Sequence, residues 1–231
     1  MIESYDVARR PRVALLCTGR ELVDASGSTL APGQIHNTNG PYLASRLRTA
    51  GADVAHAATL PDDAMPFVEA VRECLDAGVD LVISTGAVSM GRYDFVPDAL
   101  GMLGADIAFH KLAMRPGKPL LFATLPGGVP FFGLPGNPVS SAVGMRFFVE
   151  CALRAMLGMP PERPWRLPLA DAVVKKPGFH LYQKSGLRLG DEVFERLDAA
   201  VRADRDDPGH IVQHAQRALR SEVRAVATLR T

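Results

Sequence analysis

The sequence lacks an excess of charge of either sign, because its 26 Lys and Arg residues are balanced by 25 Asp and Glu residues among 231. Proteins that bind nucleic acid or an anionic membrane surface normally carry a basic excess. The sequence therefore predicts neither partner. Its 47% hydrophobic and 22% charged residues are typical of a globular protein rather than a disordered one.

Long apolar runs are also absent. None approaches the roughly 18–20 residues that span a bilayer, and the first residues lack the apolar stretch of a signal peptide. We therefore expect a cytoplasmic protein. Cysteine is scarce: Cys17, Cys74 and Cys151 are odd in number and far apart, so they predict buried reduced thiols rather than a disulfide framework or a zinc site.

Short apolar runs alternate with longer amphipathic stretches through the first two-thirds of the chain, a rhythm typical of βαβ units and a largely parallel sheet. We therefore expect an α/β domain with three layers. Strands are predicted at residues 12–17, 53–59, 80–84, 107–112, 119–125 and 129–133. Helices are predicted at residues 39–50, 63–77, 95–103 and 138–157.

The alternation stops near residue 159, where MPPERPWRLP (residues 159–168) contains four prolines. This indicates a domain boundary, with an α/β domain over residues 1–159 and a small β-rich domain over 160–231. Within the second domain, short strand-like segments at 166–175, 179–183 and 192–197 are separated by Pro–Gly and Gly–Asp turns.

Four glycine-bearing turns follow predicted strands, where open α/β sheets place their ligands. They are CTGREL (17–22), STGAVSMGRYDF (84–95), MRPGKP (114–119) and GLPGNPVSSAV (133–143). We name them the first, second, third and fourth turns. One such turn is usually only a tight connection, but four in one sheet predict a binding site.

The chemistry of these turns suits an anion, because glycine allows the backbone to approach a ligand closely with its N–H groups. Arg115 and Lys118 bracket the third turn, and Asn137 is expected to cap a helix beginning at Pro138, leaving amides near Ser140 and Ser141 free for phosphate. None of the turns has the GxGxxG or GxxxxGK[ST] spacing, so dinucleotide and P-loop sites are rejected.

Carboxylates lie beside the turns and predict a Mg²⁺ site, since Mg²⁺ takes one or two carboxylates and completes its shell with water and substrate phosphate. The candidate ligands are Glu21, Asp62, Asp63 and Asp94. For Asp63 there is an alternative, because PDDA (61–64) is also a typical helix cap.

Six motifs together resemble a known family in their order and spacing. They are RRPRVALLCTGRELV (9–23), PGQIHNTN (32–39), LPDD (60–63), DLVISTGAVSMGRYDF (80–95), LAMRPGKP (112–119) and GLPGNPVS (133–140). The family is that of molybdopterin molybdenumtransferase, known as MoeA and the gephyrin E domain, and the resemblance covers roughly residues 9–158. It implies a three-layer α/β/α molybdopterin-binding fold with a small C-terminal β-domain.

The resemblance also implies an activity. Family enzymes cleave adenylylated molybdopterin and insert molybdate with a divalent metal, releasing AMP. The residues that would act in catalysis are Glu21, Asp62, Asp94 and Lys118. Those that would bind the pterin are Thr18, Gly19, Gly86, Ser89, Gly91, Arg115, Gly117, Pro135, Gly136, Asn137, Pro138 and Ser140. A pterin substrate, a homo-oligomer and other cofactor-biosynthesis proteins are the implied partners.

The sequence departs from the family at two site positions and in its length. Arg20 replaces an aspartate of the family's TGDEL motif, and Ala87 replaces the second glycine of GGVS. Family enzymes also carry further domains before the matching segment. Alternatives are therefore a non-catalytic molybdopterin-binding module, the adenylyltransferase of the same fold, and a structural role at a partner surface. GAVSMG, LPGNP and the tail after Pro160 favour the transferase over the adenylyltransferase.

Overall fold

The computed structural model describes residues 7–24, 29–88, 94–163, 177–189 and 192–201. Ser89, Gly91 and the expected strand at 166–175 lie outside these residues. The two strands predicted at 179–183 and 192–197 are present in longer form, since the structure has strands at His180–Leu189 and Glu192–Val201. Among the described helices, none is both long and apolar enough to cross a membrane.

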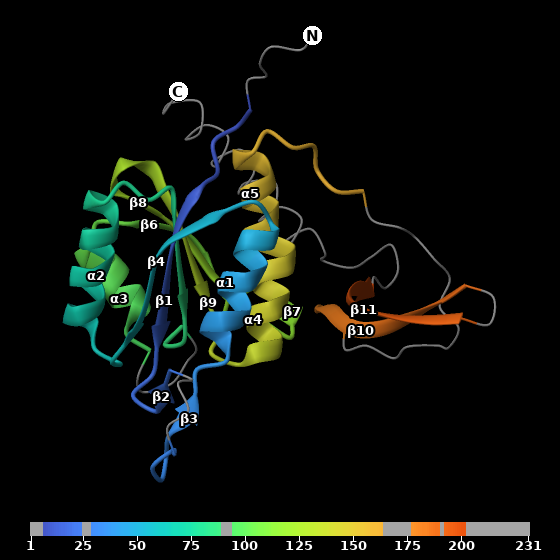
Figure 1. Ribbon diagram of the computed structural model, residues 1–231, viewed down its shortest axis with the longest axis horizontal. Coiled ribbons are helices and arrows are strands. Elements are labelled where there is room, and N and C mark those ends of the chain that lie inside the picture. The colour runs from blue at the N-terminus through green and yellow to red at the C-terminus, as the bar shows by residue number, and fades with distance from the viewer. Residues whose placement is uncertain (1–6, 25–28, 89–93, 164–176, 190–191, 202–231) are drawn as a thin grey trace.

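A six-stranded sheet forms the centre of the molecule (Figure 1). In spatial order its strands are β4 (Asp53–Leu60), β1 (Arg12–Thr18), β5 (Leu81–Thr85), β9 (Val129–Leu134), β8 (Leu121–Leu125) and β6 (Asp106–His110). The first four are parallel, and β8 runs antiparallel to both of its neighbours. The prediction of a mostly parallel α/β sheet is confirmed.

The reversal at β8 follows from the connection between β8 and β9. Only Pro126–Gly128, a 3₁₀ turn, separates the two strands, whereas a parallel crossover needs a dozen residues or more. Gly127 and Gly128 both have φ of 76°, a conformation that glycine adopts without steric cost.

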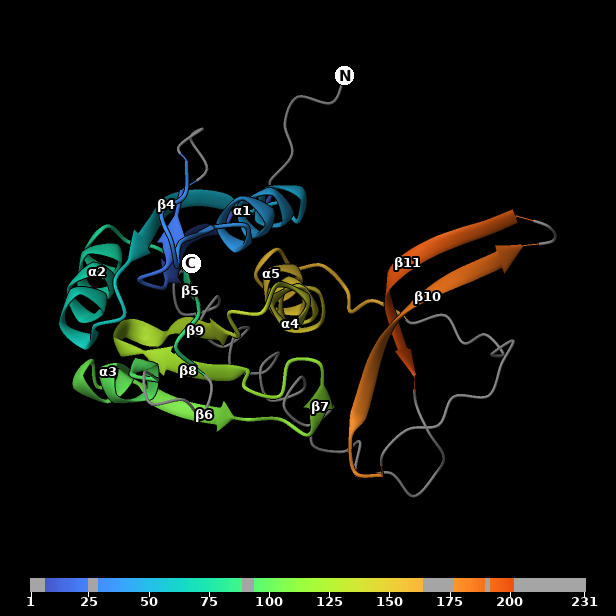
Figure 2. The same cartoon turned by 90° about the horizontal axis from the view of Figure 1, so that it is seen from below.

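Helices cover both faces of the sheet, as Figure 2 shows. On one face lie α1 (Asn39–Thr49), α4 (Pro138–Gly144) and α5 (Glu150–Met156), the last two joined by a π-helical turn at Met145–Val149. On the other lie α2 (Ala64–Asp76) and α3 (Val96–Met102). The three predicted layers are therefore present.

A hydrophobic core lies on each face of the sheet, between the strands and the helices that cover them. There are two cores because successive residues of a strand point to opposite faces. In β1, Val13 and Leu15 belong to the core beneath α1 and α4, whereas Ala14 and Leu16 belong to the core beneath α2 and α3. All four are essentially inaccessible to solvent. Burial on both faces explains why β1 is a continuous apolar run rather than an alternating one.

A second sheet joins a C-terminal hairpin to the loop between β6 and β8. The antiparallel strands β10 (His180–Leu189) and β11 (Glu192–Val201) form a hairpin, and β10 also pairs in parallel with β7 (Met114–Arg115). A third sheet contains only β2 (Leu22–Val23) and β3 (Ile35–His36). The sequence predicted neither β7 nor β2 and β3, because two-residue strands have no periodicity to detect.

Candidate functional site

The four glycine-bearing turns lie at one edge of the main sheet, the lower edge in Figure 1. β1, β5, β9 and β6 all run toward this edge, so the first, second and fourth turns leave their strands there and the third turn lies between β6 and β8. The expectation that the turns follow strand ends of one sheet is thereby confirmed for their described residues.

The first and second turns touch each other. Thr18 Oγ1 donates to the carbonyl oxygen of Thr85 at 3.3 Å. Gly86 has φ of 101°, and a Cβ on it would lie 2.5 Å from both the carbonyl oxygen and Oγ1 of Thr18. Both the backbone conformation and the space therefore require glycine at position 86.

The second turn also touches the fourth. Gly86 N donates to Leu134 O at 3.1 Å, and Thr85 Oγ1 lies 3.3 Å from Pro135 O. A Cβ at Gly136 would approach Gly86 Cα to 3.6 Å, which is an ordinary van der Waals distance. The backbones of these two turns are therefore adjacent, with Gly136 exposed to solvent.

Asn39, at the start of α1, ties these turns together. Its Nδ2 donates to Gly136 O at 2.7 Å and to Thr85 Oγ1 at 3.1 Å. Its Oδ1 is buried and has no hydrogen-bond partner in the described structure. Asn39 was not among the predicted site residues, although the sequence offered a signal, since it closes the PGQIHNTN motif.

Asn37 ties the segment ahead of α1 to the end of β4 and to Asp24. Its Nδ2 donates to Thr59 Oγ1 at 3.1 Å and to Asp24 Oδ1 at 3.3 Å, and its Oδ1 accepts from Gly40 N at 2.9 Å. The residues around the start of α1 thus hold the end of β4 through Asn37, and the end of β5 and the fourth turn through Asn39.

The fourth turn confirms one prediction and corrects another. Asn137 caps α4, as predicted, with Oδ1 accepting from Val139 N at 3.1 Å and from Ser140 N at 3.3 Å. The amides near Ser140 and Ser141 are therefore not free, because Ser141 N donates to Asn137 O at 2.9 Å. That prediction was wrong, since the Asn137 side chain accepts from the Ser140 amide and the Asn137 carbonyl accepts from the Ser141 amide.

The third turn presents two cations to solvent, since Arg115 and Lys118 are both exposed. Gly117 lies between them with φ of 100°, and a Cβ there would lie 3.7 Å from Ser140 O. The third turn therefore lies next to the helix that begins in the fourth turn. The segment that leads into this helix contains the predicted binding residues Pro135, Gly136, Asn137 and Pro138.

The predicted carboxylates are arranged more loosely. Asp62 Oδ2 accepts from Arg20 N at 3.2 Å, and Glu21 Oε2 would lie 3.0 Å from a Cβ on Gly19. These two side chains flank the first turn. Asp63 is the N-cap of α2, accepting from Met65 N at 3.1 Å, which is the alternative that the sequence offered.

The candidate metal ligands do not gather into one cluster in the part of the chain that the structure describes. Within the described residues, no group of three or more His, Cys, Asp or Glu side chains is placed to hold a metal ion. Glu21, Asp62, Asp63 and Asp94, which lies just before α3, do not form such a cluster. One or two carboxylates still fit Mg²⁺, whose remaining ligands are water and substrate phosphate.

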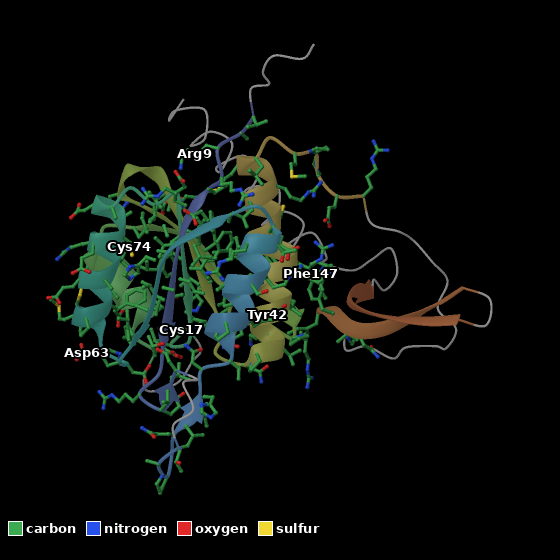
Figure 3. The ribbon with its side chains drawn as sticks, in the orientation of Figure 1. Arg9, Cys17, Tyr42, Asp63, Cys74 and Phe147 are labelled. Atoms are coloured by element: carbon green, nitrogen blue, oxygen red, sulfur yellow. The ribbon has the colours of Figure 1, made fainter. Side chains whose placement is uncertain are left out.

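Cys17 and Cys74 are buried, whereas Cys151 is partly exposed, and Figure 3 shows Cys17 and Asp63 at the same end of the molecule. Burial raises the pKa of the Cys17 thiol, although a hydrogen bond with Asn37 opposes the shift. Burial also raises the pKa of Cys74 to about 11. Both are thiols rather than thiolates near neutral pH, so neither is an activated nucleophile.

Comparison with known proteins identifies the family. A family model described as "probable molybdopterin binding domain" matches residues 14–155, which run from β1 to α5 and include all four turns. The chain belongs to this family. The resemblance stated from its motifs is thereby confirmed.

Several curated relatives of this chain are named molybdopterin molybdenumtransferase. Molybdopterin molybdenumtransferase of Synechococcus elongatus is 44% identical over 178 residues, which are 76% of this chain and 43% of the relative. Molybdopterin molybdenumtransferase 2 of Mycobacterium tuberculosis is 40% identical over 74% of this chain and 43% of the relative. The chain thus spans less than half the length of these relatives.

A solved structure of similar fold, the molybdopterin biosynthesis MoeA protein of Pyrococcus horikoshii, has a TM-score of 0.57 and 30% identity over 65% of this chain and 36% of that one. A second structure of a MoeA protein from this organism covers 80% of this chain with a TM-score of 0.60 at 22% identity, which supports the fold alone.

Proposed function

We propose that this chain binds a phosphate-bearing pterin, molybdopterin or its adenylylated form, at the edge formed by the four turns. The observation that carries the proposal is the convergence of these turns, with Asn39 joining the second and fourth and Thr18 joining the first and second. The names of the curated relatives support molybdopterin as the ligand.

Each turn would contribute differently to binding. The exposed backbone at Gly136, with Gly86 beside it, would let a flat ring system lie against the turns, while Arg115 and Lys118 supply positive charge for phosphate. Phosphate bound between two exposed cations remains sensitive to ionic strength, because exposed charges are screened by salt. The remaining predicted binding residues, Ser89 and Gly91 among them, stay part of this proposal.

We further propose that the chain takes part in the molybdenumtransferase reaction, in which the phosphoanhydride of adenylylated molybdopterin is cleaved, molybdate is inserted at the dithiolene and AMP is released. Mg²⁺ held by Glu21 and Asp62, with Asp94 as a further candidate, would neutralise charge on the phosphoanhydride. Lys118 would stabilise the same charge from the third turn. A cytoplasmic homo-oligomer is the expected setting.

The direct test mixes the purified protein with adenylylated molybdopterin, molybdate and Mg²⁺ and measures AMP. AMP release that depends on molybdate supports the transferase. Arg20→Asp restores the family's carboxylate beside Glu21, so it should increase Mg²⁺ affinity and weaken binding of the phosphorylated pterin at low salt. If neither affinity changes, Arg20 lies outside the site.

The second candidate is a molybdopterin-binding module without catalysis. Arg20 favours it, because a cation beside Glu21 reduces the local negative charge that would attract Mg²⁺. Tight binding of molybdopterin without AMP release would select this candidate. Failure of the wild-type protein to bind molybdopterin at all would contradict both.

A further inference from the structure

The third turn is supported by the distant C-terminal hairpin as well as by its own loop. At its base, Lys111 N donates to Leu120 O at 3.0 Å and Leu112 N donates to Lys118 O at 2.9 Å. These bonds close the loop but leave its outer edge, residues 113–115, without a partner strand in the main sheet. The strand β7 (Met114–Arg115) lies in that outer edge, and β10 pairs with it.

The pairing is short and specific in register. His180 lies opposite Met114, and Leu181 lies opposite Arg115. The backbone N–H of His180 donates to Ala113 O at 2.8 Å. One of the two predicted anion-binding cations is therefore carried by a two-residue strand whose described strand partner is the C-terminal hairpin.

The start of β10 is itself anchored to the first domain. Tyr182 is 8% exposed and belongs to the core beneath α1 and α4, and its ring centroid lies 4.3 Å from that of Phe147 in the π-helical turn. Figure 3 shows Phe147 on the side of the α4–α5 helix that faces the hairpin. The His180 ring is also buried, 8% exposed, and its Nε2 has no hydrogen-bond partner in the described structure.

The linker ahead of the hairpin is held to the same helix. Arg154 Nη2 donates to Pro160 O at 2.8 Å, and Arg146 Nη2 donates to Glu162 Oε2 at 2.7 Å. The continuous helix α4–α5, whose N-terminus lies in the fourth turn, therefore contacts Tyr182 through Phe147 and contacts the linker through Arg146 and Arg154. The hairpin has a fixed base from which it can hold β7.

We propose that the C-terminal hairpin is a positioning element for the third turn, and that the backbone N–H of His180 holds Ala113–Arg115 in the conformation that binds the anionic part of the ligand. The proposal rests on the proposed function for the identity of the ligand, but not for the ordering of the turn. It assigns residues 180–182 a role in binding although they lie beyond the matched family segment, residues 14–155.

The test uses two substitutions at one position in the full-length chain. His180→Pro removes the backbone donor as well as the imidazole, whereas His180→Ala removes only the imidazole. Position 180 is the first residue of β10, where proline is tolerated best within a strand. Hydrogen–deuterium exchange of residues 112–120 reports the order of the turn, and titration with molybdopterin reports binding.

We expect His180→Pro to speed exchange across residues 112–120 and to weaken molybdopterin binding by roughly threefold to tenfold, the effect of losing about one hydrogen bond. Exchange in β1 and β5 should stay unchanged. His180→Ala should bind as the wild type does. Equal exchange and equal affinity in the two variants would overturn the proposal, and so would faster exchange in His180→Pro with unchanged affinity.

If His180→Pro does not fold, Tyr182→Ala and Tyr182→Phe give the same contrast, because phenylalanine keeps the ring that packs on Phe147 and alanine does not. Weakened binding in Tyr182→Ala alone supports the proposal, and equal binding in both overturns it. A wild-type protein that does not bind molybdopterin contradicts the proposed function instead, and the exchange data then still decide whether the hairpin orders the turn.

Discussion

The two halves of the candidate site are built by different kinds of contact. The first, second and fourth turns are joined mainly by side chains, since Thr18 bonds from the first to the second and Asn39 bonds to both the second and the fourth, beside one backbone bond from Gly86 N to Leu134 O. The third turn is held by its own backbone and by pairing with β10. Side-chain ties can be cut by one substitution, whereas backbone pairing requires proline or removal of the partner strand.

The largest expected effect comes from the tightest contact in the side-chain-held half. Gly86→Ala places a Cβ 2.5 Å from Thr18 O at a φ of 101°, so it should lower the free energy of unfolding by about 3 kcal/mol or more. Thermal or urea unfolding measures the loss. Gly136→Ala is the matched control, since its Cβ meets Gly86 at 3.6 Å and should be tolerated.

Asn39→Asp is expected to have the next largest effect. It keeps the shape of the side chain but replaces the Nδ2 donor with oxygen, which then faces the acceptors Gly136 O and Thr85 Oγ1. The Gly136 carbonyl then loses its donor and faces a carboxylate oxygen, and the Thr85 hydroxyl must turn to donate instead of accepting, so the change should cost about 2 kcal/mol of stability and loosen the fourth turn. Unfolding at pH 7 that matches the wild type would show that Asn39 does not tie the turns together.

Removing the helix cap should have a smaller effect. Asn137→Ala leaves Val139 N and Ser140 N without their acceptor and should destabilise the protein by about 1 kcal/mol. Asn137→Ser keeps a cap and should recover most of that loss. Asn137→Ala should also free these two amides for phosphate. The free energy of pterin binding should therefore change less than the free energy of unfolding. A variant that unfolds like the wild type but binds the pterin more weakly would contradict this.

The smallest expected effects are in the exposed cations of the third turn. Lys118→Gln and Arg115→Gln should each weaken molybdopterin binding by roughly threefold to tenfold at low salt without changing the melting temperature. The loss should shrink as salt is raised. Unchanged affinity in both variants would remove the third turn from the site and leave binding to the side-chain-held half.

The sequence predicted the parts of this structure that depend on local patterns. Residues 12–17 and 63–77 were expected as a strand and a helix, and the structure has β1 at Arg12–Thr18 and α2 at Ala64–Asp76. The same patterns predicted the four turns, because glycine and proline mark them directly. The antiparallel pairing of β8 with β9 could also have been predicted, since the three residues between the two strands are too few to connect parallel neighbours.

What the sequence did not predict depends on contacts between distant segments. β7 has two residues and is a strand only because β10 lies beside it. Asn39 belongs to the site only because the ends of β5 and β9 lie within reach of its amide. The proposed boundary at residue 159 stays a prediction, although the contacts of Tyr182 with Phe147 and of Arg154 with Pro160 cross it.

The order in which the chain is made gives the pairing of β7 with β10 one more consequence. During synthesis, domains generally fold from the N-terminus at about 5–20 residues per second, so the six-stranded sheet and α4–α5 can assemble while residue 180 is still to come. The third turn emerges early but receives its last support late. A nascent chain that has released α5 but still holds His180 inside the ribosome would thus have a formed sheet with an unfinished third turn, and this turn would mature only near the end of translation.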